Sequence, residues 1–101
     1  MSISKVKITA VQKIKPGALL EEYGEGVEEE CPVVATGAEY ISDEIGMPDG
    51  FCPWAWSDIQ RDVVHLAMGG DFPWIKAKGT MISCCTDGLR PVIFKLDRME
   101  G

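Results

Sequence analysis

Apolar and polar residues alternate along residues 5–13, and the apolar positions are Val6, Ile8 and Ala10. A period of two residues predicts a β-strand with one buried face and one polar face. A Pro-Gly pair follows at residues 16–17. We expect this pair to end the strand, because proline removes a backbone donor and glycine favours turns.

Three further segments have the composition of strands, at residues 39–42, 80–85 and 91–96. The last two flank the turn sequence Thr-Asp-Gly-Leu-Arg, so we expect them to form a hairpin. The residues expected to face the core from its second strand are Val92, Phe94 and Leu96.

A helical period appears between these strands. Pro53 suits the first position of a helix, and Gly69-Gly70 supplies a stop, which predicts one main helix over about residues 53–68. The apolar stripe of this helix consists of Trp56, Ile59, Val63, Leu66 and Ala67.

The opposite face of the predicted helix is polar. It carries Asp58, Arg61, Asp62 and His65, which are spaced as neighbours on a helix surface. We therefore expect a solvated, charged face.

The segment before the second strand contrasts with these elements. Residues 18–23 favour a short helical turn, and residues 24–30 form an acidic run interrupted by glycine, which predicts a loop leading to Cys31. Together the elements predict an α+β fold in one domain over residues 1–101, with a small antiparallel or mixed sheet of about four strands on one main helix.

The net charge of the chain limits the kinds of partner that we expect it to bind. The chain has 16 Asp and Glu against 10 Lys and Arg, a net charge of −6. This balance disfavours nucleic-acid binding, which needs clustered Lys and Arg. No apolar run approaches the length of a membrane span or a signal-peptide core, so we expect no membrane partner and a cytoplasmic protein.

The four cysteines are the main candidates for chemistry. Cys31, Cys52, Cys84 and Cys85 each lie at a turn or an element boundary, where distant segments converge. In a reducing cytoplasm such residues act as thiols, metal ligands or redox groups more often than as structural disulfides. We therefore treat all four as candidate metal ligands.

The spacing of the cysteines favours an iron–sulfur cluster over zinc. The chain has no CxxC pair, the usual sign of a zinc knuckle, whereas the ligands of a cluster need only converge in space. Cys31 and Cys52 each precede proline, as ligands in iron–sulfur runs often do. Zinc, or no cofactor, stays the alternative.

Helix and strand geometry constrains such a site. His65 follows Cys52 by thirteen residues, about 20 Å along a helix, so the two cannot share a mononuclear site. Cys84 and Cys85 would point to opposite faces of a regular strand, so a common site needs a bend there.

Two other roles for the cysteines stay open. Free cysteine is among the most buried residue types, so all four could be small core residues. Reversible thiol chemistry of Cys84 and Cys85 ranks last, because a disulfide between adjacent residues is strained.

Four more residues are candidates for a ligand or partner surface: Trp54, Trp74, Asp87 and Arg90. Tryptophan is enriched in pockets and interfaces, and an Asp and an Arg flanking a turn can hold an anion. Core or lid packing is the more usual role for the two tryptophans. A turn-forming Asp and a surface Arg explain Asp87 and Arg90 equally well. The chain has one histidine and shows no nucleophile–base set or phosphate loop, so we expect it not to be an enzyme by itself.

The segments GFCPWAWSDIQRDV, GGDFPWIK and CCTDGLRPVIFKLDR together resemble a family of short, uncharacterised proteins of anaerobic bacteria and archaea. The likeness runs from Cys31-Pro32 to the C-terminus. The family pattern includes all four cysteines, so the resemblance implies a metal or redox role, and its anaerobic distribution implies iron–sulfur chemistry.

The leading hypothesis is a small iron–sulfur or metal-binding protein with Cys31, Cys52, Cys84 and Cys85 as ligands. It would act in electron transfer or as an accessory to an anaerobic enzyme, with a redox enzyme or another protein as partner. The alternative is a non-catalytic module that binds a small ligand or a protein and has its cysteines in the core.

Overall fold

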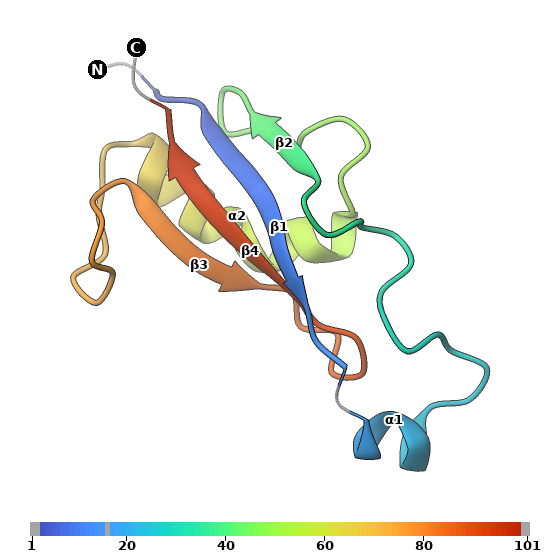
Figure 1. Ribbon diagram of the computed structural model, residues 1–101. Helices are drawn as coiled ribbons and strands as arrows, with labels where there is room; N and C mark the ends of the chain where they lie inside the picture. The colour runs from blue at the N-terminus through green and yellow to red at the C-terminus, as the bar shows by residue number, and fades with distance from the viewer. Residues whose placement is uncertain (1–2, 16, 100–101) are drawn as a thin grey trace.

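The computed structural model describes residues 3–15 and 17–99, so Pro16, expected to help end the first strand, lies outside the described residues. The elements, in chain order, are β1 (Val6–Lys13), α1 (Ala18–Tyr23), β2 (Glu39–Ser42), α2 (Pro53–Ala67), β3 (Thr80–Cys84) and β4 (Val92–Arg98) (Figure 1). Four strands and one main helix confirm the predicted α+β class.

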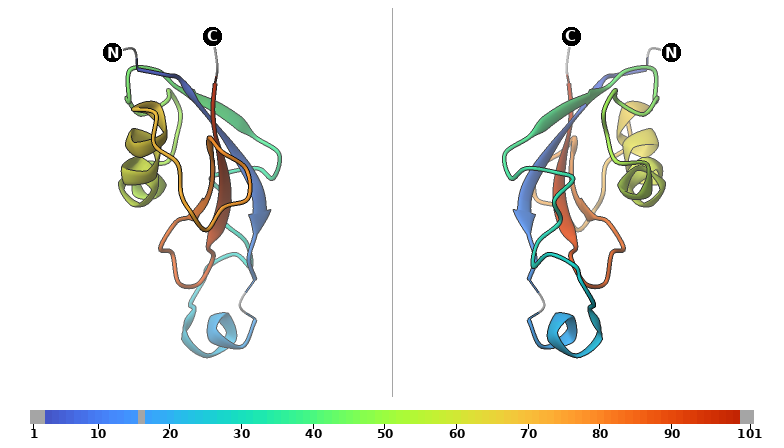
Figure 2. Two further views of the ribbon diagram at one scale, coloured as in Figure 1. Left: turned by 90° about the vertical axis from the view of Figure 1, so that its left-hand side faces the viewer. Right: turned by 90° about the vertical axis from the view of Figure 1, so that its right-hand side faces the viewer.

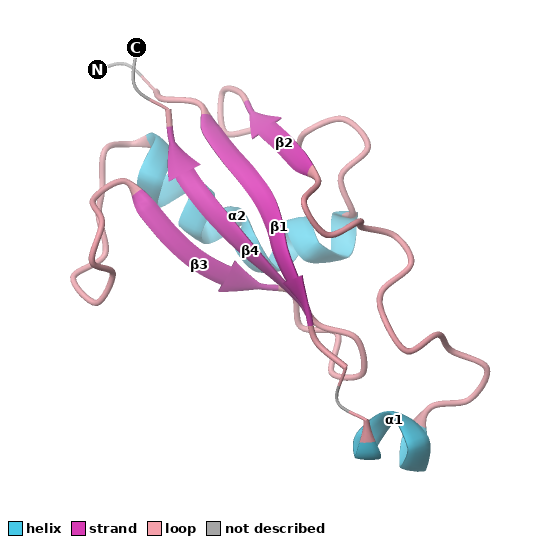
Figure 3. Cartoon of the chain, in the orientation of Figure 1, coloured by secondary structure: helices cyan, strands magenta, loops and turns pink. Residues whose placement is uncertain are grey.

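The four strands form one antiparallel sheet in the order β2-β1-β4-β3. The strands from the two ends of the chain, β1 and β4, therefore lie side by side at its centre, with Ile8 opposite Leu96. The register shifts between Ala10 and Gln12, where a bulge interrupts the pairing of these two strands. Loops join the successive helices and strands along the chain (Figure 3).

The core lies between α2 and one face of the sheet (Figure 2). The predicted inward residues of β1 and β4 are all buried, which confirms the period-two pattern. Trp56 is half-buried and packs at the edge of the core, 6.2 Å from Phe51 between ring centroids. The buried residues of α2 are Ala55, Ile59, Asp62, Val63, Leu66 and Ala67.

No helix of the described residues covers the other face of the sheet (Figure 2). Val11, Ile41 and Ile82 are all at least 40% exposed. Alternation along the strands therefore gives the sheet one face that α2 covers and one that is more exposed.

The helix α2 ends just before Gly69-Gly70, the pair that the sequence analysis expected to stop it. Gly69 has φ +92°, and its N–H donates to the carbonyl of Leu66 at 3.0 Å. The N–H of Gly70 donates to the carbonyl of His65 at 2.9 Å. These two bonds make a Schellman cap, so the helix ends at Ala67, one residue before the predicted limit.

The expectation of a solvated polar face on α2 is wrong for Asp62, which is 5% exposed. Asp62 lies three residues after Ile59 and four before Leu66, so it falls within the buried stripe. Its carboxylate lies 3.7 Å from Nε of Arg61, a side chain that is itself exposed. Position on the helix, rather than polarity, decides the burial of Asp62.

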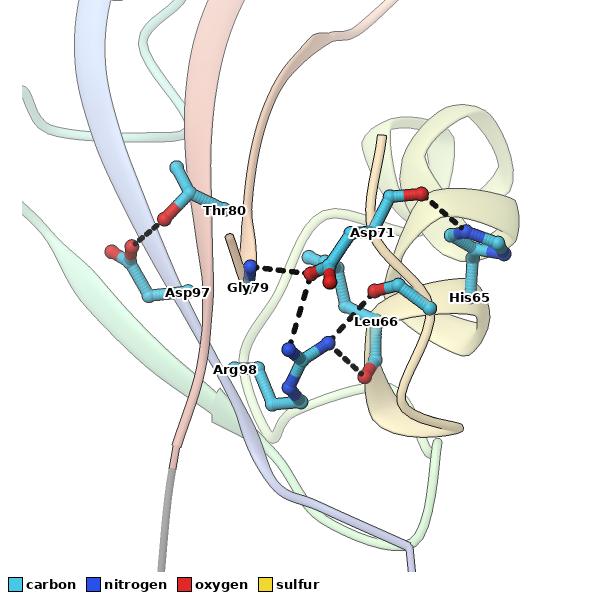
Figure 4. Close-up of polar contacts among 8 residues, drawn as sticks. His65, Leu66, Asp71, Gly79, Thr80, Asp97 and Arg98 are labelled. Atoms are coloured by element: carbon cyan, nitrogen blue, oxygen red, sulfur yellow. Dashed lines mark hydrogen bonds and ion pairs between the residues drawn. The ribbon is translucent and has the colours of Figure 1, made fainter. Parts of the chain in front are cut away.

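A polar network fastens the end of α2 to β4 (Figure 4). The Arg98 guanidinium donates to the carbonyls of Leu66 (3.2 Å) and Gly70 (2.7 Å) and to the Asp71 carboxylate (3.1 Å). The backbone N–H of Gly79 donates to the same carboxylate at 2.6 Å. These donors, the Gly79 N–H foremost, hold the pKa of Asp71 below its ordinary value of 3.8.

The segment around α1 projects from the rest of the molecule (Figures 1 and 2). No residue of α1 is buried, and Leu19 and Tyr23 are at least half exposed. We call residues 17–30 the arm. None of the helices in the described part of the chain is long and apolar enough to cross a membrane.

Candidate functional site

A cavity of about 360 Å³ lies where the start of α2, the start of β4 and the segment after the arm meet. Its size falls at the lower end of the range for small-molecule sites, about 300–1,000 Å³. The lining residues are Cys31, Val33, Val34, Cys52, Trp54, Ala55, Cys85, Asp87, Arg90, Val92 and Phe94. Three of the four cysteines, and six of the eight site residues expected from the sequence, therefore share one cavity.

Cys85 lies where the β3–β4 ladder ends. Its N–H donates to the carbonyl of Val92 at 3.1 Å, and the N–H of Val92 donates to the Cys85 sulfur at 3.3 Å. The sulfur thus replaces the backbone carbonyl that would continue the ladder. For this reason β3 ends at Cys84, one residue before the predicted limit, and the buried Cys85 thiol lines the cavity.

Cys52 and Cys31 reach the same cavity from other segments. Cys52 is the N-cap residue of α2, and its carbonyl accepts a hydrogen bond from the N–H of Trp56 at 2.9 Å. Cys31 follows the arm, and its carbonyl accepts a hydrogen bond from the Lys13 ammonium at 2.8 Å. Both cysteines are half-buried and pack against the core.

Cys84 lies outside the cavity. It pairs with Ile93, whereas its neighbour Ser83 pairs with Phe94, a core residue. Because side chains alternate along a strand, Cys84 belongs to the face of the sheet that α2 does not cover, and it is exposed. The chain does not bend enough to bring the two adjacent cysteines together.

The turn between β3 and β4 positions Asp87 and Arg90. One carboxylate oxygen of Asp87 accepts hydrogen bonds from the N–H groups of Leu89 (3.0 Å) and Arg90 (3.2 Å). The other oxygen lies 3.4 Å from Nε of Arg90. That contact lacks hydrogen-bond geometry, so the buried Nε has no hydrogen-bond acceptor among the described residues.

Asp58 anchors this turn to α2. Its carboxylate accepts hydrogen bonds from the backbone N–H of Thr86 at 2.7 Å and from the Thr86 hydroxyl at 3.0 Å. The sequence predicted Asp58 only as part of a solvated face. The structure gives it a specific role, since it holds the residue that follows Cys85 to the helix that begins after Cys52.

The two candidate tryptophans lie in different places. Trp54 lines the cavity and is 64% exposed, so it stands at the opening. Trp74 is 68% exposed and contacts Phe72 at 5.3 Å between ring centroids, and Phe72 contacts His65 at 4.6 Å. Trp74 therefore belongs to a separate aromatic group beyond the end of α2.

The part of the apolar wall that Val33 and Val34 form was not predicted. Val33 and Val34 follow Cys31-Pro32 directly, and Val34 is buried although it lies in a loop. The only sequence feature that could have indicated it is an apolar pair close to a candidate ligand. Because the pair lies outside any periodic segment, the sequence pattern does not indicate which residues it packs against.

In the described part of the chain, no group of three or more His, Cys, Asp or Glu side chains is arranged to hold a metal ion. Three cysteines nevertheless line the cavity, and the Cys85 sulfur accepts an N–H···S hydrogen bond from Val92. No protein-family model, curated protein or solved structure matches the chain.

Proposed function

We propose that the protein holds an iron–sulfur cluster through Cys31, Cys52 and Cys85 and serves in electron transfer or as an accessory to an anaerobic enzyme. One observation carries the proposal: cysteines from three separate segments of the chain line the same cavity. The ligands of a polynuclear cluster have only to converge on its irons, whereas one ion requires them to meet at a point.

The surroundings of the three thiols support this proposal. Ala55, Val92 and Phe94 supply apolar walls, which lower the dielectric around a centre and limit the access of water. The N–H of Val92 is a hydrogen-bond donor to sulfur, one of the groups that set the potential of a cluster. Arg90 also lines the cavity, where it is ion-paired with Asp87 at 3.4 Å.

Trp54 gives the proposed cluster a route to a partner. Its ring forms part of the cavity wall and is largely exposed, so a docked protein would contact the residue beside the centre. We propose a redox enzyme of the cytoplasm as that partner. Tryptophan supplies the large, rigid contact area that protein interfaces favour.

A second candidate function is a non-catalytic module that binds a small organic ligand or a protein. The observation that favours it is the packing of the cysteines, because Cys85 belongs to the buried core and both other cavity cysteines pack against it. In this function the thiols would be small apolar wall residues. Zinc bound by the same thiols would indicate a structural site instead.

The test is the iron and acid-labile sulfide content, with a visible spectrum, of protein expressed and purified without oxygen. The proposal predicts iron and sulfide in stoichiometric amounts and a broad thiolate-to-iron absorption. Zinc without colour would reassign the site as structural. Protein that is colourless and free of metal would contradict the proposal and favour the second candidate.

A further inference from the structure

The strand β3 forms one edge of the sheet, because the strand order is β2-β1-β4-β3 and β3 pairs only with β4. Figure 1 shows no further strand beside it. In the described part of the chain, no group outside β4 forms a hydrogen bond with the backbone of Thr80–Cys84. The outer side of β3 therefore has backbone donors and acceptors that the fold does not use.

The hydrogen bonds at the two ends of β3 show which of its residues face outward. The carbonyl of Gly79 accepts a hydrogen bond from β4, and the N–H of Cys85 donates one to the residue that begins β4. Backbone groups alternate in direction along a strand, so the odd-numbered residues between these two also face β4. The residues whose N–H and C=O groups face outward are therefore Thr80, Ile82 and Cys84.

This edge lacks the features that usually prevent edge-to-edge pairing. Such features are charged side chains, proline, bulges and covering segments. The sequence of β3 is Thr-Met-Ile-Ser-Cys, and its register with β4 runs without a shift. Ile82, at its centre, is 46% exposed. The other edge strand, β2, carries Glu39, so β3 is the edge better suited to another strand.

We propose that β3 pairs with β3 of a second copy of the chain, antiparallel and centred on Ile82, to form a two-fold dimer with one continuous sheet. In this register Ile82 faces Ile82 of the second copy, and Thr80 faces Cys84, so every outward N–H meets an outward C=O. The two isoleucines also contact each other on the face of the sheet that α2 does not cover. Because the contact is two-fold, the assembly closes at the dimer.

The distribution of charge favours a second copy as the occupant of this edge. Lys76 and Lys78, both exposed, precede β3, whereas Asp58 lies at the other end, where it anchors the turn to β4. Asp87 and Arg90 of that turn pair with each other. Antiparallel pairing places the lysines of each copy at the end where the other copy has Asp58. The acidic arm projects beyond the end toward which β3 runs (Figure 1), so the two arms of the dimer lie at opposite ends.

This inference does not depend on the proposed cluster. No residue of β3 lines the cavity, so pairing at the outer edge leaves the cavity as it is. The dimer is expected in protein with iron and in protein without it. Failure of the cluster proposal would therefore leave the dimer standing, and failure of the dimer would leave the cluster standing.

The test is the molar mass of the full chain by sedimentation equilibrium. Protein concentrations up to about 1 mM reveal even a weak association. We expect the mass to rise with concentration toward twice the 11.1 kDa of the chain and not beyond it. A monomer at every concentration, or a mass that continues to rise past the dimer, overturns the inference.

Two lysine variants assign the contact to β3. Ile82→Lys should raise the dissociation constant of the dimer at least about tenfold, because two lysines would face each other across the two-fold axis. Ile41→Lys is the matched control, since Ile41 is 40% exposed and lies in the other edge strand. It should associate like the unmodified protein.

If Ile82→Lys does not fold, Ile82→Pro replaces it and should also be monomeric. Proline removes an outward N–H that the fold does not use, and edge strands tolerate proline at such positions. Association of either Ile82 variant as strong as that of the unmodified protein overturns the inference. So does an equal loss of association in Ile41→Lys.

Discussion

The carboxylate of Asp71 accepts hydrogen bonds within the fold, and its contribution to stability should depend on pH. Asp71 receives the N–H of Gly79 at 2.6 Å and a guanidinium N–H of Arg98 at 3.1 Å, and these donors lower its pKa. A carboxyl whose pKa is lower in the folded state stabilises the fold fully above its unfolded pKa, about 3.8. That contribution disappears as the pH falls through the lower folded pKa.

The Asp71→Asn variant should therefore be less stable than the unmodified protein at pH 7, and the difference should shrink as the pH falls below about 4. Urea unfolding at several pH values measures this, with Asp49→Asn, a change at an exposed carboxylate, as the control. A stability gap that stays constant down to pH 2 would contradict the role of the Asp71 charge.

Gly70 provides a second test at the residue scale. A Cβ at this position would lie 2.4 Å from Nε2 of His65, so the ring would have to leave its contacts with the Asp71 carbonyl and with Phe72. Gly70→Ala should lower the free energy of unfolding by about 1 kcal/mol, the value of one net hydrogen bond.

Gly88→Ala is the matched control for this change, because no atom lies within 4 Å of its Cβ position and its φ is not positive. It should be neutral or slightly stabilising. Equal losses in the two alanine variants would contradict the account of Gly70, which attributes the cost to the displaced imidazole. Urea unfolding at pH 7 compares the two variants.

Among the elements, those with a clear hydrophobic period or a glycine stop were predicted correctly from the sequence. Alternation located β1 and β4, and the glycine pair located the end of α2 to within one residue. The actual limits of β4, residues 92–98 rather than 91–96, reflect tertiary contacts, because the N–H of Arg98 donates to the carbonyl of Gly79. Such contacts leave no trace in local sequence.

The sequence singled out six residues that line the cavity, but it did not predict how they are arranged. Cys52 and Cys85 flank elements whose patterns are clear, whereas Cys31 reaches the cavity through a long loop with no period. Cys84 and Cys85 lie on opposite faces of the sheet, as the sequence analysis expected for adjacent residues of a strand that does not bend. The N–H of Val92 donates to the Cys85 sulfur, a contact that the sequence does not reveal.

The bond between Asp58 and Thr86 links two elements and can be tested as such. Asp58→Ala removes the acceptor of the Thr86 N–H and hydroxyl. We expect the free energy of unfolding to fall by about 1–2 kcal/mol. The Cys85 thiol should also be labelled faster by a thiol reagent in metal-free protein, because the turn beside it loses its anchor.

Asp49→Ala, which removes an exposed carboxylate, serves as the control for Asp58→Ala. It should change neither the stability nor the rate of Cys85 labelling. Labelling of Cys85 that stays as slow in Asp58→Ala as in the unmodified protein would show that the anchor does not shield the cavity. Mass spectrometry of the labelled peptides identifies which thiol reacts.

Across the whole molecule, negative charge concentrates in the arm. Residues 17–30 contain six of the 16 acidic residues and none of the 10 Lys and Arg, so the ten acidic residues elsewhere balance the ten basic ones. The molecule measures 49 × 29 × 20 Å along its principal axes, and the arm projects along the sheet beyond the core (Figure 1). The excess negative charge of the chain therefore lies in the arm, outside the core.

Because no residue of α1 is buried, the arm should open more readily than the sheet. A protease specific for glutamate should cleave first within residues 17–30, and cleavage after Glu39, which lies in β2, should follow only later. Mass spectrometry of early fragments measures the order. First cleavage after Glu39 would show that the sheet opens before the arm.

We propose that Cys31, Cys52 and Cys85, and not Cys84, hold an iron–sulfur cluster. The most direct test is the iron content of Cys52→Ser and Cys84→Ser, purified side by side without oxygen. Cys52 lines the cavity and Cys84 lies on the opposite face of the sheet. We predict that Cys52→Ser loses its iron and sulfide while Cys84→Ser keeps the content of the unmodified protein. Equal iron content in the two variants would contradict the claim.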